Sequence, residues 1–182
     1  ENQIFPVYQA PSSEIILENF RDGSSSHAFQ LDLNVTFYKH LELKLGYNYL
    51  DMFRWVENEK QQLTFTARHR WMTALSYTST NELWQLDLNF RYTGSQKLPN
   101  TSNLPTEYQR ADFSEPFILG NFQVTRSWKT FDLYAGCENF TGFVQTYPII
   151  AADEPFSQFF DTSSVWGPIR GREFYVGFRY TP

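Results

Sequence analysis

The segments FDLYAGCENF at Phe131–Phe140 and EFYVGFRY at Glu173–Tyr180 decide the fold of this chain. In both, apolar and polar side chains alternate with a period of two. This period predicts β-strands, because successive side chains of a strand point to opposite faces. The second segment stops two residues before the C-terminal Pro182 and places four apolar side chains on one face: Phe174, Val176, Phe178 and Tyr180.

An aromatic-rich amphipathic strand at the C-terminus is typical of β-barrels that span outer membranes. In such barrels the last strand pairs with the first, so that no backbone edge is exposed to lipid. We therefore expect the four apolar side chains of 173–180 to mark the terminal strand, on which barrel assembly depends.

Similar alternation recurs along the chain. It is clearest at 29–37, 41–49 and 84–92, and weaker at 70–78, 117–126 and 131–139. An opening strand near Ile15–Arg21 and the terminal strand bring the total to about eight meandering, antiparallel strands. The sequence predicts an all-β chain that forms a single unit over 1–182, with a loop at residues 1–13.

The two faces of these strands differ in chemistry. The apolar faces are aliphatic in the middle and aromatic at the ends, as with Trp84 and Tyr92, which matches a lipid-facing band bounded by interfacial rings. The opposite faces carry groups that cannot be buried without hydrogen-bond partners, so we expect them to face a water-filled lumen. The predicted lumen-facing residues are Asp32, Asn34, Lys44, Asp87, Asn89, Arg91, Glu138 and Arg179.

The predicted connections alternate in length. Short ones fall at 38–40, 79–82 and 128–130, and long ones at roughly 54–67, 95–116 and 141–170. This asymmetry predicts extracellular long loops and a periplasmic C-terminus. Recognition usually lies on loops, so the candidate ligand contacts are Arg54, Trp55, Lys97, Tyr108 and Arg110. For the third loop we favour a purely structural role, with Trp166-Gly167-Pro168 as a rigid turn and Phe156, Phe159 and Phe160 as a small core.

Composition excludes several classes of function. Aromatic residues make up 19 % of the 182 residues, and the net charge of −5 argues against a nucleic-acid surface. The mean hydropathy is −0.48, and the longest apolar runs are far shorter than the roughly 20 residues of a spanning helix. Cys137 is the single cysteine, read as a small apolar residue on the lipid side, and three scattered histidines form no metal pair. We expect no catalytic residue, cofactor or metal site.

The C-terminal third resembles a known family. It carries Asn139-Phe140-Thr141, Gln145 followed by Pro148-Ile149, Trp166-Gly167-Pro168, and Gly171-Arg172 before the final strand. In this order and spacing, these elements are similar to the C-terminal end of TonB-dependent outer-membrane receptors, most of all those of Bacteroidetes-type bacteria. The resemblance extends from about residue 27 onward.

The resemblance implies a barrel of about 22 strands whose lumen holds a plug domain, in the outer membrane of a Gram-negative bacterium. Such receptors import a scarce nutrient, such as siderophore-bound iron, cobalamin, a metal or a glycan, with energy from TonB acting through the plug. The chain would then be the C-terminal part of the barrel, or one of several chains that assemble it. Its implied partners are membrane lipid, the plug and remaining strands, TonB, the barrel-assembly machinery and a surface lipoprotein, with no nucleic acid.

Three alternatives stay open at this stage. The even strand count also suits a self-contained eight-stranded barrel, which has a side-chain-filled interior and would act as an anchor or adhesin. An outer-membrane hydrolase would use His27 or His69, although no acid–His or Ser–His constellation can be assembled around them. A soluble β-sandwich is the least favoured alternative, because its solvent-facing side would not carry rows of interfacial rings.

Overall fold

The structure is a computed structural model that describes residues 3–7, 16–20, 23–56 and 58–181, with side chains for the last two ranges. It is an all-β structure in which a 3₁₀ turn at Thr106–Tyr108 is the one helical segment of the described residues. Within the same residues, no helix is long and apolar enough to cross a membrane.

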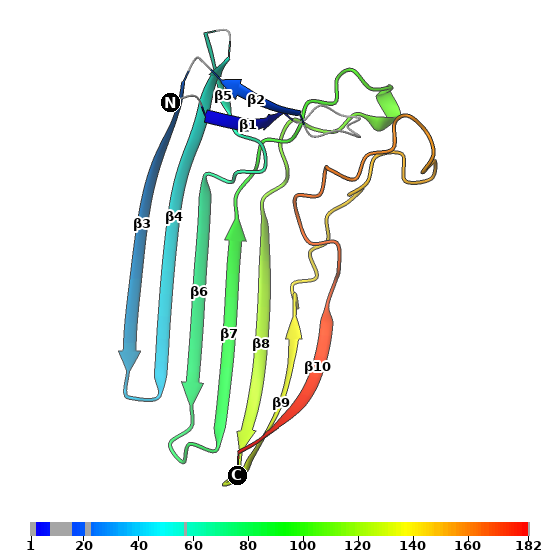
Figure 1. The fold of residues 1–182 in the computed structure, drawn as a ribbon. Coiled ribbons are helices and arrows are strands. Elements are labelled where there is room, and N and C mark those ends of the chain that lie inside the picture. The colour runs from blue at the N-terminus through cyan, green and yellow to red at the C-terminus, as the bar shows by residue number, and fades with distance from the viewer. Residues whose placement is uncertain (1–2, 8–15, 21–22, 57, 182) are drawn as a thin grey trace.

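Most of the chain forms one large antiparallel sheet in which neighbouring strands are also sequential (Figure 1). Its seven long strands are β3 (Ser24–Phe37), β4 (Leu41–Val56), β6 (His69–Thr78), β7 (Trp84–Thr93), β8 (Phe117–Ser127), β9 (Phe131–Glu138) and β10 (Glu173–Tyr180). The short β5 (Glu59–Gln62) pairs with β4 and is the eighth strand of the sheet. The predicted antiparallel meander is therefore confirmed.

The opening strand lies elsewhere than the sequence suggested. Ile16–Phe20 forms β2, which pairs with β1 (Gln3–Val7) in a separate two-stranded sheet. β1 falls inside the range 1–13, for which a loop was expected. The large sheet has eight strands all the same. β4 continues beyond the predicted end of its alternation, and its extension pairs with the short strand β5.

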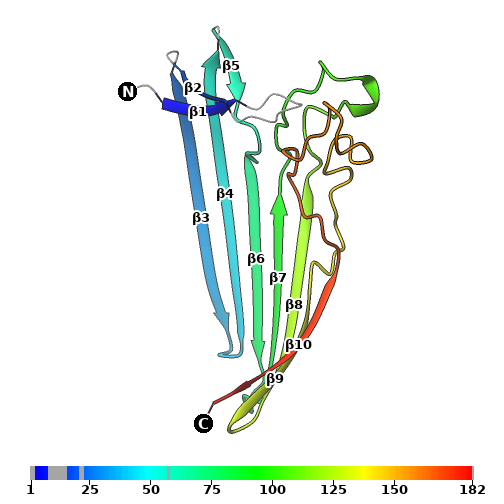
Figure 2. The ribbon, with the colours of Figure 1, turned by 45° about the vertical axis from the view of Figure 1, so that its right-hand side comes forward.

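The large sheet is curved and open. β10 pairs with β9 and β3 pairs with β4, and within the described residues neither outer strand has a second neighbour. Figure 2 shows β10 in front of β9, where the sheet curls forward. Two strand edges therefore remain available for pairing with further strands.

The connections confirm the predicted asymmetry in length. Three short turns (38–40, 79–83 and 128–130) lie at one end of the sheet together with the end of β10, and the long connections lie at the other end (Figure 1). We call these the turn end and the loop end. The tightest turn uses the left-handed region at Tyr38 (φ 52°) and Lys39 (φ 63°), and the Phe37 carbonyl accepts a 3.3 Å hydrogen bond from the His40 amide.

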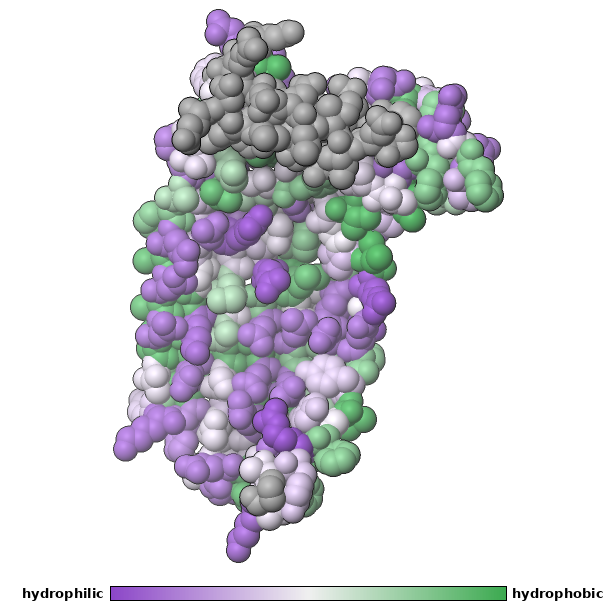
Figure 3. Space-filling model, viewed as in Figure 1, coloured by the Kyte–Doolittle hydropathy of each residue, from purple (hydrophilic) through white to green (hydrophobic). Residues whose placement is uncertain are grey.

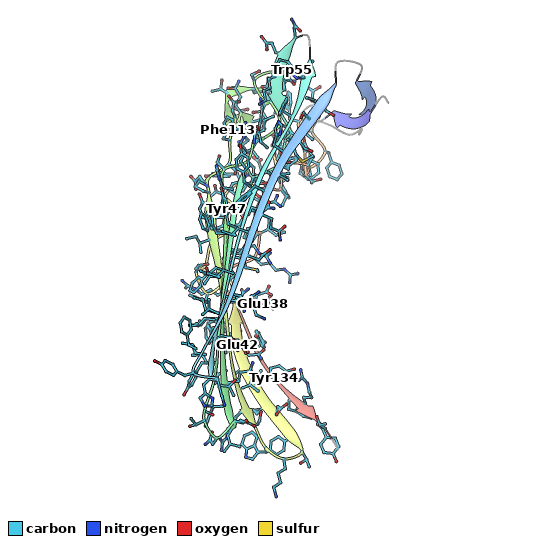
Figure 4. The ribbon with its side chains drawn as sticks, turned by 90° about the vertical axis from the view of Figure 1, so that its left-hand side faces the viewer. Glu42, Tyr47, Trp55, Phe113, Tyr134 and Glu138 are labelled. Atoms are coloured by element: carbon cyan, nitrogen blue, oxygen red, sulfur yellow. The ribbon has the colours of Figure 1, made fainter. Side chains whose placement is uncertain are left out.

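The register keeps side chains of one kind on one face. Leu33 pairs with Leu45, Leu45 with Thr73, and Thr73 with Phe90, so the alternation of each strand is in phase with that of its neighbours. The sheet therefore has an apolar face and a polar face. Figure 4 shows Tyr47 on one side of the sheet and Glu138 and Tyr134 on the other.

The buried core lies outside the centre of the sheet. Leu104, Ile150 and Ala151 form a buried cluster, against which Tyr108 and Phe159 pack. All five belong to the connections 94–116 and 139–172, which together we call the loop lobe. On the apolar face, by contrast, Phe29 is 55 % and Phe174 78 % exposed.

Candidate functional site

The eight residues predicted to face a lumen all lie on the polar face of the sheet. The register pairs Asp32 with Gly46 and Asn34 with Lys44. The cross-strand partners of the other residues likewise point to the polar face. Figure 3 views this face and shows hydrophilic side chains across the strands. Some are bonded to one another: the Ser76 hydroxyl donates to Asp87 Oδ1 at 2.6 Å, and Gln30 Nε2 donates to Asp32 Oδ2 at 2.7 Å.

Two hollows of about 220 Å³ each open on the sheet. The one nearer the loop end is lined by Asp32, Arg70 and Arg91 around Gly46. A Cβ at position 46 would stand 3.2 Å from Asp32 Oδ1, so glycine keeps this hollow open. The other lies nearer the turn end and is lined by Glu42, Lys44 and Asp87. The hollow near the loop end thus combines two guanidinium groups with one carboxylate, and the hollow near the turn end combines two carboxylates with one ammonium group.

The polar face of β9 and β10 is closed by two rings that cover two glycines. The register pairs Tyr134 with Gly177 and Tyr175 with Gly136, and a Cβ on either glycine would collide with the ring of its partner. The Tyr175 hydroxyl donates to Gln123 Oε1 at 3.1 Å. These contacts fix β10 to β9 and provide side-chain cover where the glycines have none.

The apolar face carries one row of aromatic rings near each end. The row at the loop end consists of Phe29, Tyr47, Tyr49, Trp71 and Tyr92, and the row at the turn end of Phe37, Tyr77, Trp84, Trp128, Phe131 and Tyr180. From Phe29 to Phe37 the strand spans about 26 Å at about 3.3 Å per residue. This length matches the roughly 25 Å apolar band of outer-membrane barrels.

His69 packs among the aromatic rings of the loop-end row. The Tyr47 ring lies 4.4 Å from the Trp71 ring, and the Tyr47 hydroxyl is 2.9 Å from His69 Nδ1. His69 also lies against Tyr49 at 5.3 Å. His69 pairs with Tyr49 and therefore belongs to the apolar face, beside these rings.

One close approach on the apolar face depends on glycine. The Phe140 ring packs over Gly120, between Phe90 at 5.5 Å and Phe122 at 5.8 Å. Cys137 pairs with Phe122 and Phe174 and is fully buried. Its predicted place on the apolar side is confirmed, as a small residue in a packed position.

The motif residues of the C-terminal third hold the loop lobe together. Asn139 Nδ2 donates to the carbonyls of Phe143 at 2.8 Å and Arg170 at 3.0 Å. Gln145 is buried; its Oε1 accepts from the amides of Trp166 and Gly167, and its Nε2 donates to the Ser164 carbonyl. These bonds satisfy backbone groups of a long loop that has no sheet ladder.

The expectation that the third loop packs on itself is confirmed in part. Trp166 lies against Phe143 and Phe117, whose own rings stack at 4.7 Å. Phe159 packs on Tyr108. Phe156, however, is fully exposed, so the phenylalanines of this loop do not form a single core.

Two of the five ligand candidates do not lie in a loop. Arg54 and Trp55 belong to β4, which continues to Val56 and pairs with β5. Nearby, the buried Asp51 carboxylate accepts from Arg68 at 2.8 Å and lies 3.5 Å from Lys60, whose ammonium is 3.6 Å from the centre of the Phe53 ring. This strand extension is a hairpin with two charge pairs around Asp51.

The other three candidates lie in the loop lobe. The backbone of Lys97 forms an isolated antiparallel β-bridge with that of Phe113, and the side chain of Tyr108 packs into the lobe core. Burial, followed by the negative charges of Glu154, Asp153 and Glu107, raises the pKa of Tyr108 above its ordinary value.

Arg110 lines a cavity of about 150 Å³ between the two segments of the lobe. Aromatic residues Phe113, Tyr147 and Trp166 share this lining, and the Arg110 guanidinium is 5.6 Å from the centre of the Tyr147 ring. Its Nε is buried and has no hydrogen-bond partner among the described residues. Sequence reasoning named Arg110 but missed Tyr147, which is 37 residues away in the chain.

The described residues contain no group of three or more His, Cys, Asp or Glu side chains arranged to hold a metal ion.

Comparison with known proteins gives matches to solved structures alone. No protein-family model matches the sequence, and no curated protein matches it significantly. The structure is similar to the ferric-catecholate import receptor Fiu of E. coli (TM-score 0.63, 11 % identity, 98 % of this chain and 23 % of that chain). It is also similar to the copper transporter OprC (0.65, 13 %, 98 % and 27 %). A third match is the ferric enterobactin receptor PfeA of Pseudomonas aeruginosa (0.60, 18 %, 98 % and 27 %).

These matches are TonB-dependent receptors, and the sheet of this chain has the fold of a segment of their barrels. The chain spans about a quarter of the length of the structures it matches. These proteins are transporters and receptors.

Proposed function

We propose that this chain is the C-terminal barrel segment of a TonB-dependent transporter in the outer membrane of a Bacteroidetes-type Gram-negative bacterium. The observation that carries the proposal is the two-faced sheet. The alternation of apolar and polar side chains is in register across all seven long strands, so that one face is apolar and bounded by two aromatic rows and the other face is polar. In this role the loop end is extracellular and the turn end, with the C-terminus, is periplasmic.

The two faces would then have separate tasks. The apolar face contacts membrane lipid. The polar face lines a lumen and contacts a plug, for which the guanidiniums of Arg70 and Arg91 offer charged anchor points. TonB acts through the plug, the barrel-assembly machinery recognises the β10 strand, and a surface lipoprotein contacts the long loops.

The loop lobe would capture the nutrient, which we place among siderophore-bound iron, cobalamin, metals and glycans. The cavity at Arg110 supports this role, because it combines a cation that has a spare buried donor with three aromatic side chains. An anionic group on the substrate would satisfy both the charge and the unpartnered Nε.

Intact mass spectrometry of the native outer-membrane protein, with sequencing of its N-terminus, tests the proposal. We expect a mass several-fold above the 21.5 kDa of this chain, with plug sequence upstream. A native mass of 21.5 kDa would contradict transport by a single chain.

The self-contained eight-stranded barrel is the less favoured alternative. Closure of such a barrel requires β10 to pair with the first strand, and in the described residues β10 pairs with β9 alone.

A further inference from the structure

Arg126 is an exception on the apolar face. It pairs with Trp84 on β7 and with Leu133 on β9, so the register points its side chain away from the polar face. Between the two aromatic rows and along the turn-end row, it is the one Asp, Glu, Lys or Arg that the described strands carry on this face. A charge on a lipid-facing surface is costly unless its head group reaches the interface and finds a partner.

Two indole rings hold the guanidinium of Arg126. Its Cζ lies 4.9 Å from the centre of the Trp84 ring and 5.3 Å from that of Trp128. The Trp128 ring is itself stacked on Phe131 at 4.5 Å with an interplanar angle of 14°. These contacts fix the side chain beside the short turn 128–130, and the positive charge forms no ion pair with a described carboxylate.

We propose that Arg126, Trp84 and Trp128 form a binding site for the phosphate of a phospholipid in the periplasmic leaflet. The proposal rests on the membrane placement of the proposed function, in which the turn end lies at that leaflet. A planar guanidinium binds phosphate oxygens in a bidentate manner, and tryptophan rings favour the head-group level of the bilayer. The site therefore complements a head group whose acyl chains lie along the aliphatic band above it.

Native mass spectrometry of the whole outer-membrane protein that carries this chain tests the site. The probes are dioleoyl phosphatidylethanolamine and dioleoylglycerol, which has the same chains without phosphate. The variants are Arg126→Ala, Arg126→Lys and, as a matched control, Lys129→Ala in the adjacent turn. Folded and unfolded protein give separate charge-state distributions in this measurement, so lipid retention is read from the folded species alone and a loss of folded protein is seen separately from a loss of binding.

We expect Arg126→Ala to weaken retention of the phospholipid about tenfold, as for the loss of one charge-assisted contact. Arg126→Lys should retain part of the binding, Lys129→Ala all of it, and dioleoylglycerol should bind equally to every variant. Equal phospholipid retention by the wild type and Arg126→Ala would overturn the proposal, as would an equal loss in Lys129→Ala.

Two further outcomes separate this site from its alternatives. Inorganic phosphate at the concentration of the lipid should displace none of it; displacement would assign a free-anion site instead. If the wild type binds neither lipid, the membrane placement itself is overturned, and with it the proposed function. If the wild type binds phospholipid and Arg126→Ala binds it equally well, only the head-group site is overturned.

Discussion

The sheet and the loop lobe bury their side chains in opposite ways. In the lobe, Ile150 is fully buried and packs with Leu104, while Gln145 is 3 % exposed and fully hydrogen-bonded. In the sheet, large apolar side chains such as Phe29 and Phe178 stay more than half exposed, although the backbone ladder is continuous. The lobe carries its own core, whereas the apolar face of the sheet leaves its side chains exposed, as the proposed contact with lipid requires.

This difference shows which forces act on each region. The lobe is stabilised by water-excluded packing and by polar groups that satisfy loop backbone, as in a soluble protein. The sheet is stabilised by its hydrogen-bond ladder, and its faces are matched to two different surroundings. Substitutions should therefore have different effects in the two regions.

The largest effect is expected in the lobe core. Ile150→Ala removes a fully buried side chain and should cost about 2–5 kcal/mol of lobe stability. Phe156→Ala is the matched control, since Phe156 is fully exposed and its loss should fall within about 0.5 kcal/mol. Hydrogen exchange of 139–172 measures both, and equal effects would show that the lobe has no core of its own.

A slightly smaller effect is expected on the apolar face. Leu88→Arg places a charge in the middle of the aliphatic band and should destabilise the folded barrel by about 2–4 kcal/mol. Asn89→Arg, one residue along the same strand on the polar face, should be nearly neutral. Denaturant unfolding of the native protein in bilayers gives both values. Similar losses in both variants would mean that the two faces do not meet different solvents.

The buried amide of Gln145 comes next. Gln145→Ala leaves the amides of Trp166 and Gly167 and the Ser164 carbonyl without their present partners, at a cost of about 1–3 kcal/mol for a buried group. Protease cleavage within 139–172 should become faster, while Thr146→Ala, an exposed neighbour, should leave the rate unchanged. An unaltered cleavage rate in Gln145→Ala would show that the Gln145 side chain does not stabilise the lobe.

The smallest expected effect concerns ligand capture and not stability. Arg110→Ala should weaken binding of an anionic nutrient about tenfold, the loss of one charge-assisted contact, and should leave unfolding nearly unchanged. Glu107→Ala on the exposed side of the same segment serves as the control. Binding of candidate nutrients to the native protein by calorimetry gives the ratio, and an unchanged affinity for every anionic nutrient that binds would exclude the Arg110 cavity as the capture site.

Most of the sheet was predictable from the sequence because period-two alternation is a local property. The predicted strand 84–92 corresponds to β7 at Trp84–Thr93, and the eight polar residues share one face as expected. The extension of β4 was missed because Asp51 interrupts the apolar pattern, although its charge is compensated by Arg68 and Lys60.

The lobe was less predictable because its contacts join residues far apart in the chain. Gln145 bonds to residues 19 to 22 positions away, and the cavity brings Arg110 together with Tyr147 and Trp166. No periodicity marks such pairs. The resemblance identified these motifs, but their physical role as hydrogen-bonded supports became visible only in three dimensions.

Whether the two faces of the sheet meet lipid and water is tested by the collision accessibility of spin labels at Leu88→Cys and Asn89→Cys, in a Cys137→Ala background of the native protein in bilayers. We predict that the label at position 88 collides with lipid-dissolved oxygen and the label at position 89 with a water-soluble nickel chelate. Equal accessibility of the two labels, or the reverse pattern, would contradict a sheet with one face in lipid and the other in an aqueous lumen.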